Sequence, residues 1–78
     1  MTATSIGQQL REARVRSGLS LREVVARSGG KVGSAATLSL IETGKRHPSL
    51  HTLEGVARAL DLSVVVGPRK VTVRKEAA

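Results

Sequence analysis

The sequence contains no cysteine and no phenylalanine, tyrosine or tryptophan. Without cysteine there can be no disulfide scaffold, zinc knuckle, thiol nucleophile or iron–sulfur cluster, and this composition fits a reducing cytoplasm. Without aromatic rings the chain lacks the surfaces on which OB and RRM modules stack unpaired bases. We therefore expect a cytoplasmic protein whose contacts with any nucleic acid depend on charge, hydrogen bonds and shape.

Acidic residues and long apolar runs are also scarce. The 78 residues include 6 Asp/Glu against 13 Lys/Arg, a net charge of +7 with neutral histidines. No apolar run approaches the roughly 20 residues of a membrane span, and the N-terminus lacks the pattern of a signal peptide. A chain this short buries only about 60% of the surface that it exposes when unfolded, so a second subunit would add core. The sequence predicts a basic homodimer without a membrane partner.

The residue patterns of catalysis are missing. There is no nucleophile–base pair, no acidic metal cluster and no evident site for a small-molecule substrate or cofactor. The glycines between Gly29 and Gly33 lack the preceding strand and the spacing of a nucleotide-binding loop. His47 and His51 have the spacing of a metal pair, but Pro48 interrupts the helical face that they would share. We expect neither an enzyme nor a metal site.

Four stretches have helical periodicity with start and stop signals. Ser5 with Gln8 and Ser20 with Glu23 are capping-box patterns, and glycines follow the expected helix ends. The helices are expected over about Ile6–Ser17, from Ser20 to about Ser28, from Ser34 to Gly44, and from Ser49 to Leu60. The expected core residues of the last two helices are Leu38, Ile41, Leu50, Leu53, Val56 and Leu60.

The second and third expected helices, joined through Gly29–Gly33, form a candidate helix-turn-helix. Three segments closely resemble the Xre-type, lambda-repressor-like helix-turn-helix family: Leu19–Gly29, Thr37–Leu50 and Thr52–Leu60. The most diagnostic piece is Leu40-Ile-Glu-Thr-Gly-Lys-Arg-His-Pro-Ser49. The resemblance covers Ile6 to about Leu62 and implies a mostly α fold, a bundle of four to five helices that binds double-stranded DNA.

The resemblance also implies roles for individual residues. An arginine late in the first helix commonly pairs with the glutamate of the diagnostic run, which implies an ion pair between Arg14 and Glu42. Base edges would be read by early residues of the recognition helix: Ser34, Ala35, Ala36, Thr37, Ser39 and Leu40. DNA phosphates would be contacted by Ser20, Leu21, Arg22, Lys31, Thr43, Gly44, Lys45 and Arg46.

Two features depart from the family pattern. The turn between the two helices is about three residues longer, through Gly30–Gly33, and this extension could move Lys31 or tilt the recognition helix. The expected base-reading side chains are small or apolar and make no bidentate contact with a base. Alanine and leucine can touch a thymine methyl group, so sequence preference would depend on such contacts together with DNA shape, water and half-site spacing.

The C-terminal segment changes character. Residues 1–62 are expected to form the helix-turn-helix domain and residues 63–78 a basic, strand-forming tail. The pattern of Leu62–Val66 and Val71–Val73 predicts one or two β-strands. The strands need a partner, which can be a hairpin across Gly67–Lys70, a second subunit or another protein. Dimerisation is assigned to valines of this tail: Val64, Val65, Val66, Val71 and Val73.

Two functions follow. The first is a homodimeric, sequence-specific regulator of transcription, expected to be a repressor, that reads the major groove of DNA. The second is an antitoxin that binds a toxin protein and autoregulates its operon. The tail resembles that of DNA-binding antitoxins paired with kinase-like toxins, in which a short C-terminal strand adds to an intersubunit sheet.

Overall fold

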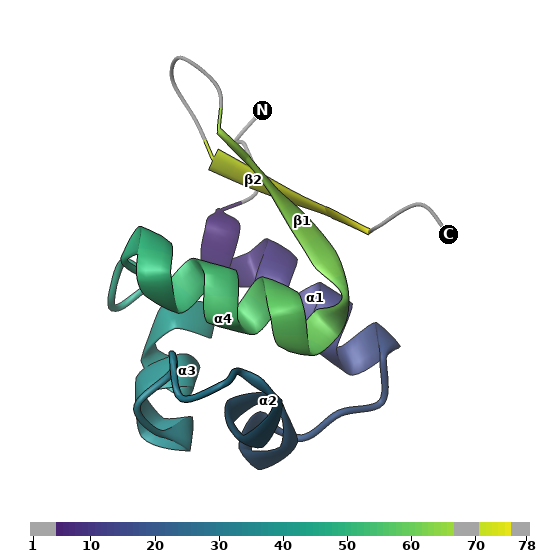
Figure 1. Ribbon diagram of the computed structural model, residues 1–78. Helices are drawn as coiled ribbons and strands as arrows, with labels where there is room; N and C mark the ends of the chain where they lie inside the picture. Colours follow the sequence, from purple (N-terminus) through teal and green to yellow (C-terminus); the bar gives the residue numbers. More distant parts are fainter. Residues whose placement is uncertain (1–4, 67–70, 76–78) are drawn as a thin grey trace.

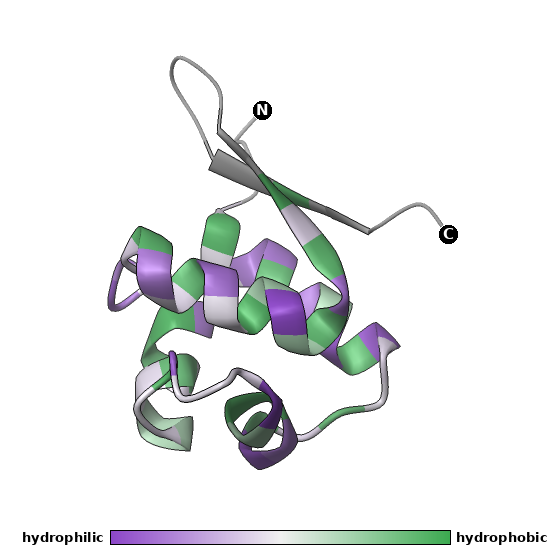
Figure 2. Ribbon diagram, in the orientation of Figure 1, coloured by the Kyte–Doolittle hydropathy of each residue, from purple (hydrophilic) through white to green (hydrophobic). Residues whose placement is uncertain are grey.

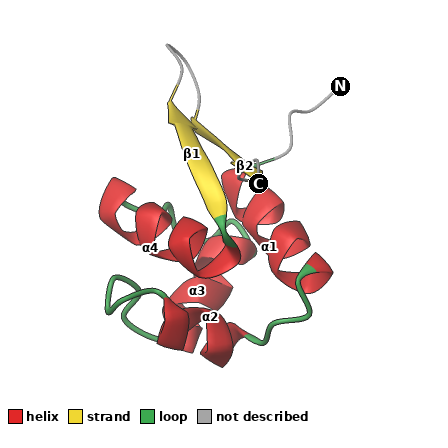
Figure 3. Ribbon diagram, turned by 45° about the vertical axis from the view of Figure 1, so that its right-hand side comes forward, coloured by secondary structure: helices red, strands yellow, loops and turns green. Residues whose placement is uncertain are grey.

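A computed structural model describes residues 5–66 and 71–75. Its elements are α1 (Ile6–Arg16), α2 (Leu21–Arg27), α3 (Ala35–Glu42), α4 (Leu50–Leu60), β1 (Leu62–Val66) and β2 (Val71–Lys75) (Figure 1). The helices form one bundle, and the two strands lie on the side of α1 and α4, away from α2 and α3 (Figure 3). The predicted fold class, a mostly helical helix-turn-helix bundle with a short C-terminal β segment, is confirmed.

Serine hydroxyls begin all four helices. Ser5, Ser20, Ser34 and Ser49 each accept a hydrogen bond at 3.1 Å from the backbone N–H three residues later. These caps are local signals, and the helices therefore begin where the sequence predicts. The first two helices end one residue earlier than expected, at Arg16 and Arg27, because Ser17 and Ser28 are their C-cap residues.

The core is built from aliphatic side chains of all four helices. Apolar and polar residues are interspersed along each helix, so that one side can be buried (Figure 2). The prediction that Leu50 belongs to the core is wrong, since this side chain is 57% exposed. Leu50 is the first residue of α4, and helical side chains lean toward the N-terminus, which carries Leu50 past the end of the bundle. The buried apolar residues are Leu10, Ala13, Val24, Val32, Leu38, Ile41, Leu53, Val56, Ala57 and Leu60.

α1 and α3 approach each other at Gly7. A Cβ atom added to Gly7 would overlap the carbonyl oxygen of Ile41 and lie 3.4 Å from the Cα of Glu42. Only a residue without a side chain fits between these backbones. The end of α3 is therefore held directly against the start of α1.

The two strands form an antiparallel hairpin within the chain, the first of the three pairings that the sequence allows. Val64 faces Val73 across the hairpin, and both side chains pack against the core of their own chain. The backbone N–H of Val73 also donates to Gln9 Oε1 of α1 at 3.5 Å. Of the other valines assigned to dimerisation, Val65, Val66 and Val71 take part in the strand pairing, but their side chains lie outside the described residues.

Across the described part of the chain, no helix combines the length and the apolar character that crossing a membrane requires.

Candidate nucleic-acid interface

The segment between α2 and α3 is longer than the sequence resemblance implies, and it is packed. Val32 at its centre is 3% exposed and belongs to the core. The buried hydroxyl of Ser28 donates to the Val25 carbonyl at 2.7 Å and accepts the Val32 N–H at 3.3 Å. Gly29 and Gly30 follow with positive φ angles of 71° and 80°. Sequence reasoning missed Val32 and Ser28, and the available signal was a single apolar residue within a glycine-rich turn.

The same turn also lies against α4. A Cβ atom added to Gly55 would be 3.3 Å from the Ser28 carbonyl oxygen, and one added to Gly29 would be 3.2 Å from Nη1 of Arg58. Lys31, expected at phosphate, is half-buried, with its Cβ beside Gly55. The longer turn is therefore held against α4 at two glycines, Gly29 and Gly55.

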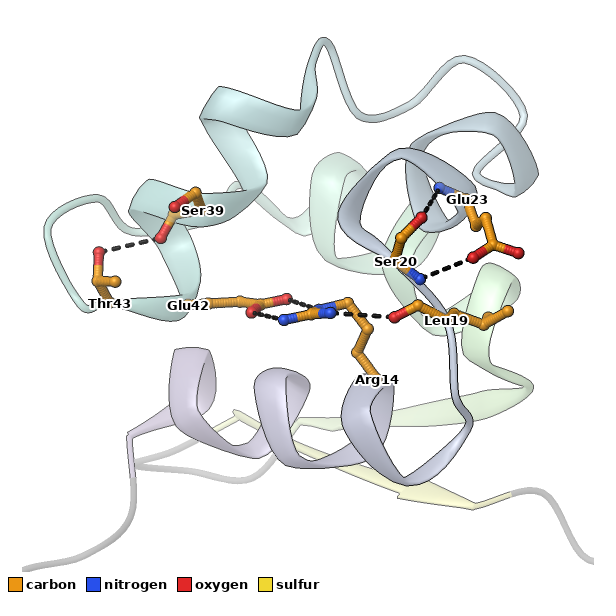
Figure 4. A network of polar contacts seen from close by, with 7 residues as sticks. All are labelled: Arg14, Leu19, Ser20, Glu23, Ser39, Glu42 and Thr43. Carbon is orange, nitrogen blue, oxygen red and sulfur yellow. Dashed lines mark hydrogen bonds and ion pairs between the residues drawn. The ribbon is translucent and has the colours of Figure 1, made fainter.

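Arg14 connects three parts of the bundle (Figure 4). Its guanidinium makes a two-pronged ion pair with Glu42, with Nε 2.8 Å from Oε2 and Nη2 3.0 Å from Oε1. Nη1 donates to the Leu19 carbonyl at 3.0 Å, just before α2. The Glu42 side chain is 4% exposed and that of Arg14 16%. The hydrogen bond to Glu42 raises the pKa of Arg14 above its ordinary value, so the guanidinium stays charged at neutral pH.

A basic loop follows α3 in a fixed conformation. Thr43 caps the helix, and its hydroxyl donates to the Ser39 carbonyl at 2.9 Å. Gly44 has a φ of 80°, and its N–H donates to the Ile41 carbonyl at 3.1 Å. The Lys45 N–H donates to the Leu40 carbonyl at 2.9 Å, which completes a Schellman motif. The backbone that carries the exposed side chains of Lys45 and Arg46 is thus hydrogen-bonded to the Leu40 carbonyl.

The residues expected to read bases lie along α3 and at its cap. Ser34 is exposed and accepts the Thr37 N–H, and its hydroxyl oxygen lies 3.1 Å from that of Thr37. Ala36 and Leu40 are exposed, four residues apart on the side opposite the buried Leu38 and Ile41. The remaining expected readers, Ala35, Thr37 and Ser39, are half-buried.

The N-terminus of α2 is occupied by its own capping box. The Ser20 N–H donates to Glu23 Oε1 at 2.9 Å, while the Glu23 N–H donates to the Ser20 hydroxyl. Leu21 is half-buried against the core. Of the three residues expected at phosphate here, Arg22 is the one with an exposed cationic side chain. The hydrogen bonds from Ser20 lower the pKa of Glu23, which keeps this carboxylate negatively charged at neutral pH.

Within the described residues, no group of three or more His, Cys, Asp or Glu side chains has an arrangement that could hold a metal ion.

Two comparisons with known proteins agree with this geometry. A family model described as a helix-turn-helix domain matches residues 5–66. The uncharacterised HTH-type transcriptional regulator y4dL of Sinorhizobium fredii (strain NBRC 101917 / NGR234) is 47% identical over 66 residues, which cover 85% of this chain and 32% of that protein. The chain thus spans about a third of the length of this relative. No solved structure matches the chain. The α2–turn–α3 unit, the Arg14–Glu42 pair and the matched family model lead to one conclusion: the chain belongs to the helix-turn-helix domain family.

Proposed function

We propose that this domain binds double-stranded DNA as part of a transcriptional regulator, with α3 in the major groove. The observation that carries the proposal is the network of hydrogen bonds around Arg14. Its guanidinium joins α1 to the residue before α2 and to the end of α3. Exposed cations stand on two of the elements that Arg14 joins: Arg22 at the start of α2, and Lys45 and Arg46 directly after α3. The relative's printed description as a transcriptional regulator supports the same role.

The roles of individual residues are part of this proposal. Lys45 and Arg46 bind phosphate on one side of α3, because their backbone amides are held by Leu40 and their side chains are exposed. Arg22 binds phosphate at the start of α2. Lys31 can contribute only its terminal amine, since its Cβ is packed beside Gly55.

We further propose that the protein acts as a homodimeric repressor. A two-fold dimer places two α3 helices in successive major grooves, about 34–36 Å apart. The two-stranded sheet favours this assembly, because a sheet of only two strands gains stability when a further strand is added. The same small sheet supports the second candidate, an antitoxin that offers a strand to a toxin protein.

The salt dependence of binding to a duplex tests the phosphate contacts. The double variant Lys45→Ala/Arg46→Ala is expected to reduce the slope of log K against log salt by about 2, since each phosphate contact contributes about 1. The matched control is Arg11→Ala/Arg16→Ala, which removes two exposed cations from α1 and should leave the slope within about 0.5 of the wild-type value. Equal slopes for the two double variants would contradict the proposed interface.

A footprint on a selected duplex tests the assembly. A symmetric footprint with half-sites about one helical turn apart supports the homodimer. Co-purification with the product of an adjacent gene would instead favour the antitoxin role.

A further inference from the structure

α3 lacks the side chains that usually read bases. Residues 35–42 contain no Arg, Lys, Asn or Gln, the side chains that make two hydrogen bonds to one base. The charged residue of the helix, Glu42, is buried and paired with Arg14. Thr37 lies within hydrogen-bond distance of the cap residue Ser34, and the hydroxyl of Thr43 donates to carbonyls of the same helix. Hydrogen bonding to base edges therefore contributes little from this helix.

The largest exposed side chain of α3 is apolar. Leu40 is 40% exposed, and it lies on the side opposite the buried Leu38 and Ile41. Ala36, one turn earlier on the same side, is also exposed. In the major groove the apolar feature of a base pair is the C5 methyl group of thymine, so this surface fits thymine better than any other base.

The position of Leu40 relative to the basic loop supports this fit. The Leu40 carbonyl accepts the N–H groups of both Lys45 and Arg46, at 2.9 and 3.2 Å. The backbone amides of the two cationic residues are therefore hydrogen-bonded to Leu40, whose own side chain is exposed. When Lys45 and Arg46 contact phosphate, Leu40 is held at the adjoining groove with little freedom to turn away.

We infer that Leu40 is a specificity-determining residue that recognises the C5 methyl group of thymine in double-stranded DNA. This inference rests on the proposed function. It predicts that the preferred duplexes carry a thymine at a defined position of each half-site. It also predicts that discrimination at this position comes from apolar contact and not from a hydrogen bond.

The test uses a duplex selected by the whole chain from a random library, and the same duplex with deoxyuridine replacing thymidine at one position at a time. Deoxyuridine lacks only the C5 methyl group and still pairs with adenine. At one position per half-site, the replacement is expected to weaken binding by about fourfold, the value of one buried methyl-sized group. In Leu40→Ala the same replacement should change the affinity by less than about 1.5-fold, because the contact is already gone.

The matched control is Leu50→Ala, which shortens an exposed leucine outside α3 and should retain the fourfold discrimination. Circular dichroism of each variant checks that the fold is intact, which is expected because both leucines are exposed. Equal wild-type affinity for the thymidine and deoxyuridine duplexes would overturn the inference, and so would full discrimination in Leu40→Ala. If no duplex is enriched and no salt-dependent binding is seen, the proposed function itself fails, which is a different result from salt-dependent binding without methyl discrimination.

Discussion

Gly55 of α4 lies so close to Lys31 of the α2–α3 turn that a Cβ atom on Gly55 would be 2.5 Å from the Cβ of Lys31. The neighbouring Ser28 carbonyl oxygen and Cβ would be 3.3 and 3.4 Å away. None of these atoms is the end of a flexible side chain. The longer turn therefore depends on a glycine in another helix.

Gly55→Ala is expected to destabilise the protein by about 1–3 kcal/mol, the usual cost of overpacking a well-packed contact. This loss should appear even though alanine favours a helix interior over glycine by about 1 kcal/mol. Urea unfolding measures the change. Gly33→Ala is the matched control in the same turn, because an added Cβ meets nothing within 4 Å there, and its stability should stay within about 0.5 kcal/mol of wild type. A Gly55→Ala variant more stable than wild type would show that the turn does not need this contact.

The Arg14–Glu42 ion pair predicts that substitutions of its two residues have strongly non-additive effects on stability. Arg14→Met and Glu42→Met should each destabilise the protein by about 3 kcal/mol, because each leaves a largely buried charge without its partner. The double variant should lose less than the sum of the two, since two apolar side chains can replace the pair. A double-mutant cycle from urea unfolding measures this coupling. Arg16→Met, an exposed position on the same helix, is the control, and additive losses would argue against a coupled pair.

The capping box of α2 predicts a pH dependence. The backbone N–H and the hydroxyl of Ser20 lower the pKa of Glu23 in the folded state. A lowered folded-state pKa adds stability above the ordinary carboxyl pKa of about 4.3, and this stability is lost as the pH falls through the folded value. Glu23→Gln keeps an acceptor but does not titrate, so its deficit relative to wild type should be present at neutral pH and vanish in acid. Unfolding between about pH 3 and 7 follows the difference, and a constant deficit would refute the linkage.

Leu50 and Leu53 occupy the same helix but differ in burial, and the sequence pattern treats them alike. Leu53 is 3% exposed and Leu50 is 57% exposed. Leu53→Ala is expected to cost about 2–5 kcal/mol, and Leu50→Ala less than about 0.5 kcal/mol. Thermal or urea unfolding of the two variants compares them directly. Similar losses at both positions would mean that Leu50 is covered in solution.

These cases show which features can be predicted from the sequence. Helix starts depend on a serine and the amides that follow it, and glycines mark the ends, so both are local signals. The motif that contains Glu42 led to its partner Arg14 through family resemblance. In contrast, the packing of Val32, the exposure of Leu50 and the contact at Gly55 depend on how distant elements meet. Hydrophobic periodicity does not contain that information, because the extended turn and α4 are far apart in the sequence and meet only in the folded chain.

Because α1 and α3 approach each other closely at Gly7, a side chain at this position is expected to disturb the candidate interface strongly. In Gly7→Ala the new Cβ would overlap the Ile41 carbonyl oxygen, a backbone atom that can move only if α3 moves. The displacement would also strain the nearby Arg14–Glu42 pair, because Glu42 follows Ile41 at the end of α3. We expect a loss of about 3 kcal/mol or more, at the upper end of overpacking costs. Duplex binding should weaken even where the variant remains folded, since α3 and its basic loop are displaced together. Circular dichroism and duplex titration at one temperature separate the two effects, and wild-type stability in Gly7→Ala would contradict the close packing of α1 and α3.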